Sequence, residues 1–348
     1  MNTKLVKIEN NPQVFREAGD ILKAGGLVAF PTETVYGLGG NALDASAAKK
    51  IYAAKGRPSD NPLIVHVADT KSLYELASFV PDNAKKLADR FWPGPLTMIL
   101  PKKESVPDGT TGGLKTVAVR MPDHPAALEL IRTSGVYIAA PSANTSGRPS
   151  PTCAEHVMED LDGKIEMILD GGTVGIGIES TIVDLTGDIP VILRPGYITK
   201  QMLEEVIGEV TVDPAVLSRH PDPGLKPKAP GMKYKHYAPK ADLIILEGDS
   251  DRVIERINQE TGKAKEQGKK TGVIATTETQ AFYQADVVRV IGSREKETTI
   301  AHGLYGILRE FDKDEVDIIF SESFSDGTWG QAVMNRLLKA AGYQVITV

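Results

Sequence analysis

A proline-rich stretch divides the sequence into two parts and limits what the chain can fold into. Residues 211–240 show little hydrophobic periodicity and contain six prolines: Pro214, Pro221, Pro223, Pro227, Pro230 and Pro239. Proline has no backbone N–H and a fixed φ, so neither a helix nor a central strand can run through this stretch. We therefore expect a domain at residues 10–210, a linker at 211–240 and a second domain at 241–348.

Strand-length and helix-length segments alternate on both sides of this linker. In residues 241–348, expected strands at 243–246, 272–275, 287–291 and 317–320 are separated by expected helices at 251–267, 300–311 and 330–341. This order is typical of a small parallel α/β domain. Because residues 241–348 contain neither G-x-G-x-x-G nor a Walker A motif, nucleotide binding is not indicated in this part of the chain. Residues 10–210 have too many strands between helices for a purely parallel order, which predicts a mixed α/β sheet.

Charge is unevenly distributed along the chain. The net charge of −6 argues against a protein dominated by nucleic-acid binding. Residues 218–240 carry six Lys and Arg against one Asp, between two acidic blocks. Within that basic segment, cations alternate with aromatic rings at Lys233, Tyr234, Lys235, His236 and Tyr237. Such a pattern suits phosphate contact and base stacking, so we expect more than a spacer here.

Cysteine content and hydropathy restrict the cellular setting. Cys153 is the single cysteine, which excludes an intrachain disulfide and a cysteine zinc cluster. The sequence starts without an apolar signal core, and no apolar run is long enough to cross a bilayer. We expect a cytoplasmic protein without a membrane partner.

Residues 55–67 are the first candidate for a binding site. Lys55 and Arg57 flank Gly56, a Pro58–Pro62 turn follows, and residues 63–67 form a short apolar strand interrupted by His66. Lysine suits phosphate as a point charge and arginine as a planar fork, and glycine lets the backbone approach a ligand. The alternative is a helix end with solvated charges, in which Lys55 complements the helix dipole, followed by a buried structural histidine.

Two polar loops follow predicted strands in the same half of the chain. Residues 31–39 offer two threonines, a glutamate and a tyrosine beside glycines, and residues 141–151 offer four hydroxyls, an amide and Arg148. Hydroxyl-rich loops at the carboxyl ends of strands are common phosphate sites, although a plain surface loop is the alternative for 141–151. A further strand at 116–120 places Thr116 and Arg120 on one face.

These motifs in combination resemble the YrdC/YwlC family of threonylcarbamoyl-AMP synthases. The matching segments are Pro31–Leu38, Lys55–Pro58, Asn61–Leu63, Pro93–Thr97, Val119–Pro122, Pro141–Gly147, Ser180–Asp184 and Arg194–Gly196. The resemblance covers about residues 10–210. The Pro230–Pro239 segment and the C-terminal block are similar to the long, two-domain form of the family.

The resemblance implies a fold and a reaction. The implied fold is a twisted open mixed α/β sheet with a positive concave cavity, followed by a smaller Rossmann-like domain. The implied reaction joins L-threonine, bicarbonate and ATP, with Mg²⁺, into threonylcarbamoyl-AMP and pyrophosphate for the threonylcarbamoyladenosine modification of tRNA. The implied partners are tRNA-modification proteins that accept the adenylate, with tRNA itself bound weakly at most.

The resemblance also assigns roles to residues. Lys55 and Arg57 are the expected catalytic residues. The expected ATP-binding residues are Lys55, Arg57, Asn61, Thr116, Ser142, Asn144 and Arg194. The expected threonine-binding residues are Thr34, His66, Arg120, Ala140 through its backbone, and Ser180. The expected lid consists of Lys233, Tyr234, Lys235, His236 and Tyr237, and the magnesium ligands are not identified.

The chemistry of this reaction agrees with the residues. An N-carboxylated threonine is already an anion when it attacks the α-phosphate, so no strong general base is needed, and we find no convincing His–carboxylate dyad. Two other functions stay open at this point. One is an RNA-binding protein with a basic concave surface, and the other is a carbamoyl-transferring relative with a different acceptor.

Overall fold

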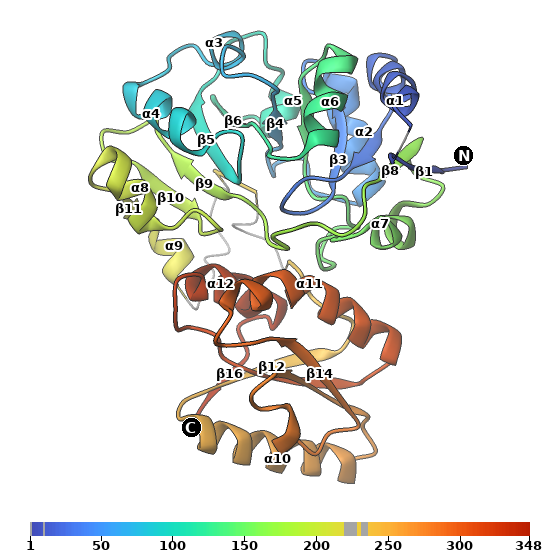
Figure 1. The fold of residues 1–348 in the computed structure, drawn as a ribbon, viewed down its shortest axis with the longest axis vertical. Helices are drawn as coiled ribbons and strands as arrows, with labels where there is room; N and C mark the ends of the chain where they lie inside the picture. The colour runs from blue at the N-terminus through green and yellow to red at the C-terminus, as the bar shows by residue number, and fades with distance from the viewer. Residues whose placement is uncertain (1, 10, 219–227, 231–235) are drawn as a thin grey trace. The chain divides into compact units, whose positions relative to one another are not determined.

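The computed structural model describes residues 2–9, 11–218, 228–230 and 236–348 of the chain. By its internal contacts the chain divides into two compact units (Figure 1). The first comprises residues 1–146, 150–175 and 179–233, and the second comprises residues 234–348 with the short segments 147–149 and 176–178.

The first unit is built on an eleven-stranded mixed sheet with the order β1-β8-β2-β3-β7-β4-β6-β5-β9-β10-β11. Its strands are β1 (Lys4–Lys7), β2 (Val28–Phe30), β3 (Gly37–Asn41), β4 (Ile64–His66), β5 (Leu96–Pro101), β6 (Thr116–Arg120), β7 (Ile138–Ala140), β8 (Met167–Asp170), β9 (Thr181–Asp184), β10 (Val191–Arg194) and β11 (Thr211–Val212). β6 pairs parallel with β4 and antiparallel with β5, so the sheet is mixed as the sequence predicts.

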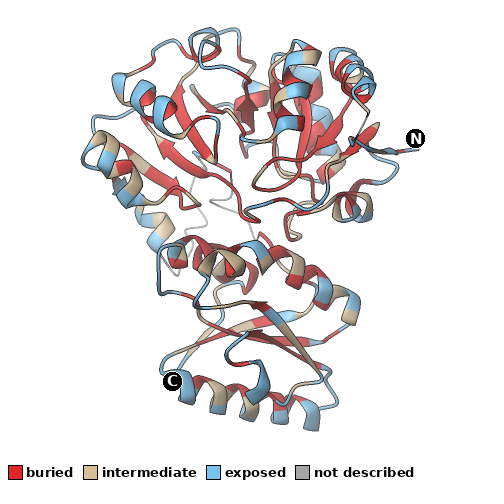
Figure 2. Ribbon diagram, in the orientation of Figure 1, coloured by how far each residue is buried: buried red, intermediate tan, exposed pale blue. Residues whose placement is uncertain are grey.

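The helices of the first unit are α1 (Gln13–Lys23), α2 (Ala45–Lys55), α3 (Leu73–Leu76), α4 (Asp82–Phe91), α5 (Asp108–Thr111), α6 (Pro125–Ser134), α7 (Ala154–Leu161), α8 (Lys200–Ile207) and α9 (Pro214–Leu217). The sheet is covered on both faces. Along β2, Val28 and Phe30 join the core beneath α1 and α6, whereas Ala29 joins the core on the opposite face. The buried residues therefore form a continuous layer through the strands (Figure 2).

Several elements differ from the sequence prediction. Residues 37–39, expected to be the end of a polar loop, belong to β3. The glycines of β3 hide the strand pattern, yet they are required because a Cβ on Gly39 would lie 2.7 Å from Ile138 Cγ2. The four-residue elements β1 and α3 have no clear signal in the sequence. Such short elements are defined by their neighbours rather than by periodicity.

The second unit contains a five-stranded, wholly parallel sheet with the order β14-β13-β15-β12-β16. Its elements are β12 (Asp242–Glu247), α10 (Ser250–Glu266), β13 (Thr271–Thr276), η1 (Gln280–Phe282), β14 (Val287–Gly292), α11 (Glu297–Asp314), β15 (Ile318–Glu322), α12 (Gly330–Ala340) and β16 (Val345–Thr347). Figure 1 shows α10 on one face of this sheet and α11 and α12 on the other. The predicted small parallel α/β domain is confirmed. In the part of the chain that the structure describes, no helix has the length and apolarity needed to span a bilayer.

Candidate functional site

The strand register brings two of the predicted threonine-binding residues together. His66 on β4 pairs with Arg120 on the parallel strand β6, and with Ile138 on β7. Ala140 pairs with Ile64 on the other side of β4. These residues lie within three adjacent central strands, where the backbone fixes their spacing.

Arg120 is almost fully buried and is surrounded by the loop before β3. Its Nη1 donates to Thr34 Oγ1 at 3.0 Å, and its Nη2 lies 2.7 Å from Glu33 Oε1. Beyond this ion pair, both Glu33 carboxylate oxygens are buried without a hydrogen bond among the described residues. An acceptor held in this state beside a cation is suited to a ligand that brings an N–H or O–H donor.

A second arginine reaches the same neighbourhood from β10. Arg194 donates from Nε to the Ser180 carbonyl at 3.0 Å and from Nη2 to Ser180 Oγ at 3.1 Å. Ser180 Oγ in turn lies 2.8 Å from Thr97 Oγ1, and Thr97 pairs with Arg120 across β5 and β6. Ser180, predicted for threonine, and Arg194, predicted for ATP, are therefore hydrogen-bonded neighbours.

Lys55 ends α2 and is only 2% exposed, so the alternative of a solvated charge is excluded for this residue. Its Nζ donates to the Ser142 carbonyl at 2.5 Å and to the Asn144 carbonyl, and it lies 3.4 Å from Asn144 Oδ1. Ser142 Oγ donates to Asn144 Oδ1 at 2.5 Å. One ammonium group thus joins the Lys-x-Arg and Ser-x-Asn motifs, which are 87 residues apart in the chain.

Arg57 and Asn61 meet in the turn that follows α2. Arg57 Nη2 donates to the Pro62 carbonyl at 3.1 Å and to the Asn61 carbonyl at 3.3 Å. The Asn61 side chain is buried, and its Oδ1 accepts no hydrogen bond from a described residue. Thr116 is half-buried at the start of β6, about 13 Å along the strand from Arg120. Within the described residues, no side-chain hydrogen bond joins Thr116 to the other predicted ATP-binding residues.

His66 is neutral in the folded protein. Burial, reinforced by the positive charge of Arg120, lowers its pKa to about 3, although hydrogen bonds to backbone groups of Ile64 and Ile138 oppose this. Its Nδ1 lies 3.1 Å from the Ile64 carbonyl, and its ring packs edge-on against Phe30 with 5.9 Å between ring centroids. A neutral, buried imidazole can orient a ligand by hydrogen bonding but cannot act as an acid near pH 7.

The sequence does not reveal the partners of every polar group in this region. Glu33 is visible as part of a polar loop but not as a neighbour of Arg120. Ser150 is visible as a hydroxyl of the loop 141–151, but not as a fully buried donor to Glu179 Oε1, which it contacts at 2.6 Å. Two sequence features could have pointed to these contacts. Glu33 lies between two threonines, and Glu179 directly precedes Ser180 of a family motif.

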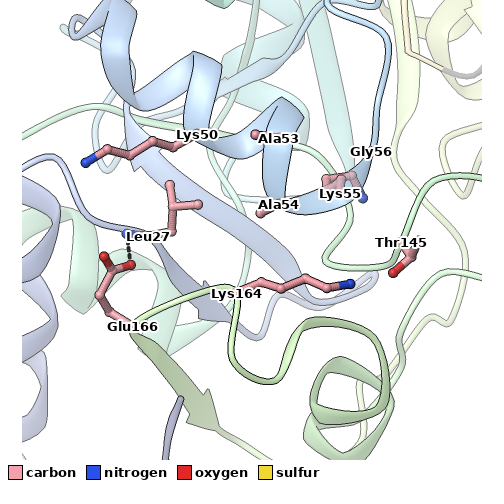
Figure 3. A pocket seen from close by; sticks show the side chains of 9 residues that line it. All are labelled: Leu27, Lys50, Ala53, Ala54, Lys55, Gly56, Thr145, Lys164 and Glu166. Atoms are coloured by element: carbon pink, nitrogen blue, oxygen red, sulfur yellow. Dashed lines mark hydrogen bonds between the residues drawn. The ribbon is translucent and has the colours of Figure 1, made fainter. Parts of the chain in front are cut away.

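Lys55 also borders a cavity of about 600 Å³, whose wall includes Thr145 (Figure 3). Lys50 and Lys164 line it too, and their Nζ atoms donate to the backbone carbonyls of Gly25 and Asp160. The Glu166 carboxylate in the same wall accepts from the Leu27 N–H at 2.7 Å. Three lysines and one glutamate therefore give this part of an acidic protein a local positive charge.

Only part of the predicted lid falls within the described residues. Lys233, Tyr234 and Lys235 lie outside them. His236 and Tyr237 are both buried in the second unit, where the Tyr237 ring lies 5.1 Å from that of Tyr305 on α11. Closure over a ligand stays a prediction.

The residues described by the structure contain no cluster of three His, Cys, Asp or Glu side chains that could hold a metal ion.

Comparison with known proteins extends these observations. The family model Sua5_yciO_yrdC, described as "Telomere recombination", matches residues 20–196. A second model, "Threonylcarbamoyl-AMP synthase, C-terminal domain", matches residues 198–342. The threonylcarbamoyl-AMP synthases of Bacillus subtilis and Pyrococcus abyssi are each 54% identical to the chain, over 97% and 96% of its length and 95% of theirs. The chain belongs to the threonylcarbamoyl-AMP synthase family.

A solved structure of a family member has the same fold as this chain. The crystal structure of Pyrococcus abyssi Sua5 complexed with L-threonine is 51% identical, covers 100% of both chains and superposes with a TM-score of 0.94. The mixed-sheet first unit and the parallel second unit are therefore the two domains of the family.

Proposed function

We propose that this protein is an L-threonylcarbamoyladenylate synthase that forms threonylcarbamoyl-AMP and pyrophosphate from L-threonine, bicarbonate and ATP. Full-length relatives at 54% identity carry this name, and a relative of the same two-domain fold binds L-threonine. The observation that carries the proposal is the position of two buried arginines next to the hydrogen-bonded Thr97–Ser180 pair: Arg194 donates to Ser180, and Arg120 is the cross-strand neighbour of Thr97. This arrangement supplies a fork for the amino-acid carboxylate beside a cation for phosphate.

The threonine half of the site would use Arg120, Thr34 and Ser180. Arg120 would bind the α-carboxylate, since a guanidinium matches a carboxylate in two parallel hydrogen bonds. The Glu33 oxygens would accept the N–H of the N-carboxylated threonine, which is attached to the same carbon as the carboxylate. His66, neutral and next to Arg120, would complete the pocket without adding charge.

The ATP half would use Lys55, Arg57 and Arg194, with Asn61, Ser142, Asn144 and Thr116 as polar lining. A carbamate oxygen attacks the α-phosphorus and forms the new P–O bond. The bond from that phosphorus to the oxygen bridging to the β-phosphate breaks, and pyrophosphate leaves with that oxygen. The nucleophile is already an anion, so the chain's contribution is orientation and neutralisation of phosphate charge. Mg²⁺ bound to the phosphates would neutralise further charge.

The segment 230–239 would act as a lid that keeps water from the labile adenylate. Its alternation of cations and aromatic rings supports this role. Removing residues 230–239 should lower the yield of threonylcarbamoyl-AMP and shorten its lifetime in the presence of enzyme. Unchanged yield and lifetime in a folded deletion variant would exclude a lid.

Cytoplasmic location and delivery of the adenylate to tRNA-modification proteins complete the proposal. They follow from the use of the product in tRNA modification, and weak binding of tRNA itself is compatible with a net charge of −6.

The deciding experiment measures pyrophosphate release from ATP and Mg²⁺, with L-threonine and bicarbonate each present or omitted. Release should require both, and Arg57→Ala should abolish it while the exposed control Arg132→Ala does not. Release with carbamoyl phosphate or another amino acid in place of these substrates would favour the carbamoyl-transfer function. Salt-sensitive tRNA binding without any threonine-dependent release would favour the RNA-binding function.

A further inference from the structure

The second unit contains a cavity that the synthase reaction does not use. It has a volume of about 210 Å³ and is lined by Arg294, Glu297, Ile300, Phe324, Asp326, Gly327, Trp329, Gly330 and Val333. These residues follow β14 and β15 or begin α11 and α12. The cavity therefore lies at the carboxyl ends of the parallel strands.

The sheet order makes this edge a preferred place for a ligand. The chain leaves β13 toward β14 on one side and leaves β15, through α12, toward β16 on the other. β13 and β15 are neighbours, so the connections diverge between them, and open parallel sheets bind ligands at such divergences. The two loops are tied here, because Thr279 after β13 donates to the carboxylate of Glu322 at the end of β15.

The Arg294 side chain is held in place by contacts with residues 322–324, at the carboxyl end of β15. Its Nη2 donates to Glu322 Oε2 at 2.6 Å and to the Ser323 carbonyl at 3.0 Å, and its guanidinium lies 5.2 Å from the centre of the Phe324 ring. Glu322 is 3% exposed and also accepts from the Tyr283 hydroxyl at 2.9 Å. Nε and Nη1 of Arg294 make no hydrogen bond within the described part of the chain, so their N–H groups can donate to the acceptor atoms of a ligand.

Two acidic side chains, Glu297 and Asp326, also line the cavity. Glu297 Oε2 accepts from the Thr328 and Trp329 N–H groups at 2.7 and 3.3 Å, which fixes the loop before α12. Among the described residues, Glu297 Oε1 and the exposed Asp326 carboxylate accept no hydrogen bond. Ile300 and Val333 contribute buried apolar surface to the cavity wall, and Phe324 and Trp329 add aromatic surface.

We propose that this cavity binds a free α-amino acid with an apolar side chain of about leucine size. Arg294 would receive the carboxylate, Glu297 and Asp326 the ammonium group, and the apolar lining the side chain. Pockets for drug-sized ligands measure about 300–1,000 Å³, so a cavity of 210 Å³ suits a smaller molecule. The acidic rim and the absence of a glycine-rich phosphate motif argue against a nucleotide. The proposal does not depend on the threonine site, since all its residues belong to the second unit.

The tryptophans of the chain provide a direct probe. Trp92 lies in the first unit and Trp329 lines the cavity, and the sequence has no others. In full-length Trp92→Phe protein, titration with L-leucine should change the fluorescence of Trp329 and saturate. Calorimetric titration of the wild-type chain with L-leucine should give the same dissociation constant. This measurement is the control for a folding defect in Trp92→Phe. Absence of saturable binding of L-leucine, L-methionine and L-phenylalanine by calorimetry would overturn the proposal.

Ligand analogues and variants test the assigned contacts. 4-Methylpentanoate lacks the ammonium group and 3-methylbutylamine lacks the carboxylate, so each should bind about tenfold or more weakly than leucine. Arg294→Met should weaken leucine binding to a similar extent, whereas Arg252→Met, an exposed arginine on α10, should not. Equal binding of either analogue, or leucine binding unaffected by Arg294→Met, would exclude a zwitterion site.

Threonine-dependent pyrophosphate release by Arg294→Met without leucine should equal that of the wild type. If the wild-type chain also shows no threonine-dependent release, that result contradicts the proposed synthase activity. The leucine titration still tests the cavity, because it does not depend on pyrophosphate release.

Discussion

Lys55 shows how one buried charge can serve both structure and binding. Its ammonium group donates to the carbonyls of residues 142 and 144. It therefore fixes the loop that carries Ser142 and Asn144, and by our proposal it also contributes positive charge to the ATP half of the site. Exchange of this residue should affect catalysis and stability together.

We predict that Lys55→Met lowers kcat/KM for pyrophosphate release by about 100-fold or more, in the range found when an electrostatic contact to a transition state is lost. The free energy of unfolding of the first unit should also fall, because the loop carbonyls lose their donor. Steady-state kinetics and denaturant unfolding measure the two effects. Lys49→Met, an exposed lysine on the same helix, serves as control, and near-wild-type kinetics for Lys55→Met would contradict a role in ATP binding.

Glu33→Gln should raise KM for L-threonine about tenfold, with little change in KM for ATP. The reason is that its two buried carboxylate oxygens lie beside Arg120 and accept no hydrogen bond from a described residue. They can therefore accept one from the N–H of the bound threonine. Initial rates at varied threonine and fixed ATP measure this, with exposed Glu75→Gln as the matched control. Equal rises in both KM values would indicate that Glu33 only maintains the fold of the site.

The lowered pKa of His66 predicts that the free energy of unfolding depends on pH. Its folded pKa of about 3 lies below the unfolded value of about 6.5, so the unfolded chain binds the extra proton between these values. The resulting stability is fully present above pH 6.5 and is lost as pH falls, at up to about 1.4 kcal/mol per unit. Unfolding free energies of wild type and His66→Gln at pH 7.5, 5.5 and 4.5 measure it. A constant difference between the two proteins would show that His66 is not buried as a neutral ring.

At the scale of elements, α2 was predictable because its signals are local. Asp44 caps its first turn by accepting from the Ser46 N–H, and Gly56 ends it with a φ of +62°. Both residue types are visible in the sequence as helix boundaries. The same holds for β6, whose alternation placed Thr116 and Arg120 on one face.

β3 and the Glu33–Arg120 ion pair could not be predicted in the same way. β3 has glycine at three of its five positions, and what makes it a strand is pairing with β2 and β7. Arg120 and Thr34 are 86 residues apart, and only the strand order brings them together. The family motifs named most of the site, but the contacts of Lys55, Glu33 and Ser150 depend on this non-local arrangement.

We predict that Gly56→Ala destabilises the first unit by about 1–2 kcal/mol. No heavy atom outside its chain neighbours lies within 4 Å of a Cβ built on Gly56, so the cost comes from the left-handed backbone alone. Thermal unfolding measures it. Gly175→Ala, where a Cβ also meets open space but φ is not left-handed, should be neutral. A neutral result for Gly56→Ala would mean that α2 ends differently in solution.

At the scale of the whole molecule, the two units have separate hydrophobic cores and, by our proposals, separate ligands. A ligand that binds one native unit stabilises that unit by RT ln(1 + [L]/Kd), which is about 2.7 kcal/mol at 100 times its Kd. In the intact chain, L-threonine with ATP should therefore slow amide exchange in β4, β6 and β9. L-Leucine should instead slow exchange in α11 and the start of α12.

Hydrogen exchange followed by mass spectrometry resolves these segments in one experiment. Arg120→Ala should remove the threonine-dependent protection only, and Arg294→Met should remove the leucine-dependent protection only. Because each arginine lies within one unit, loss of both effects in either variant would contradict independent sites. Protection of the central strands of the first unit by leucine would show that it enters the threonine site and that the cavity of the second unit has another role.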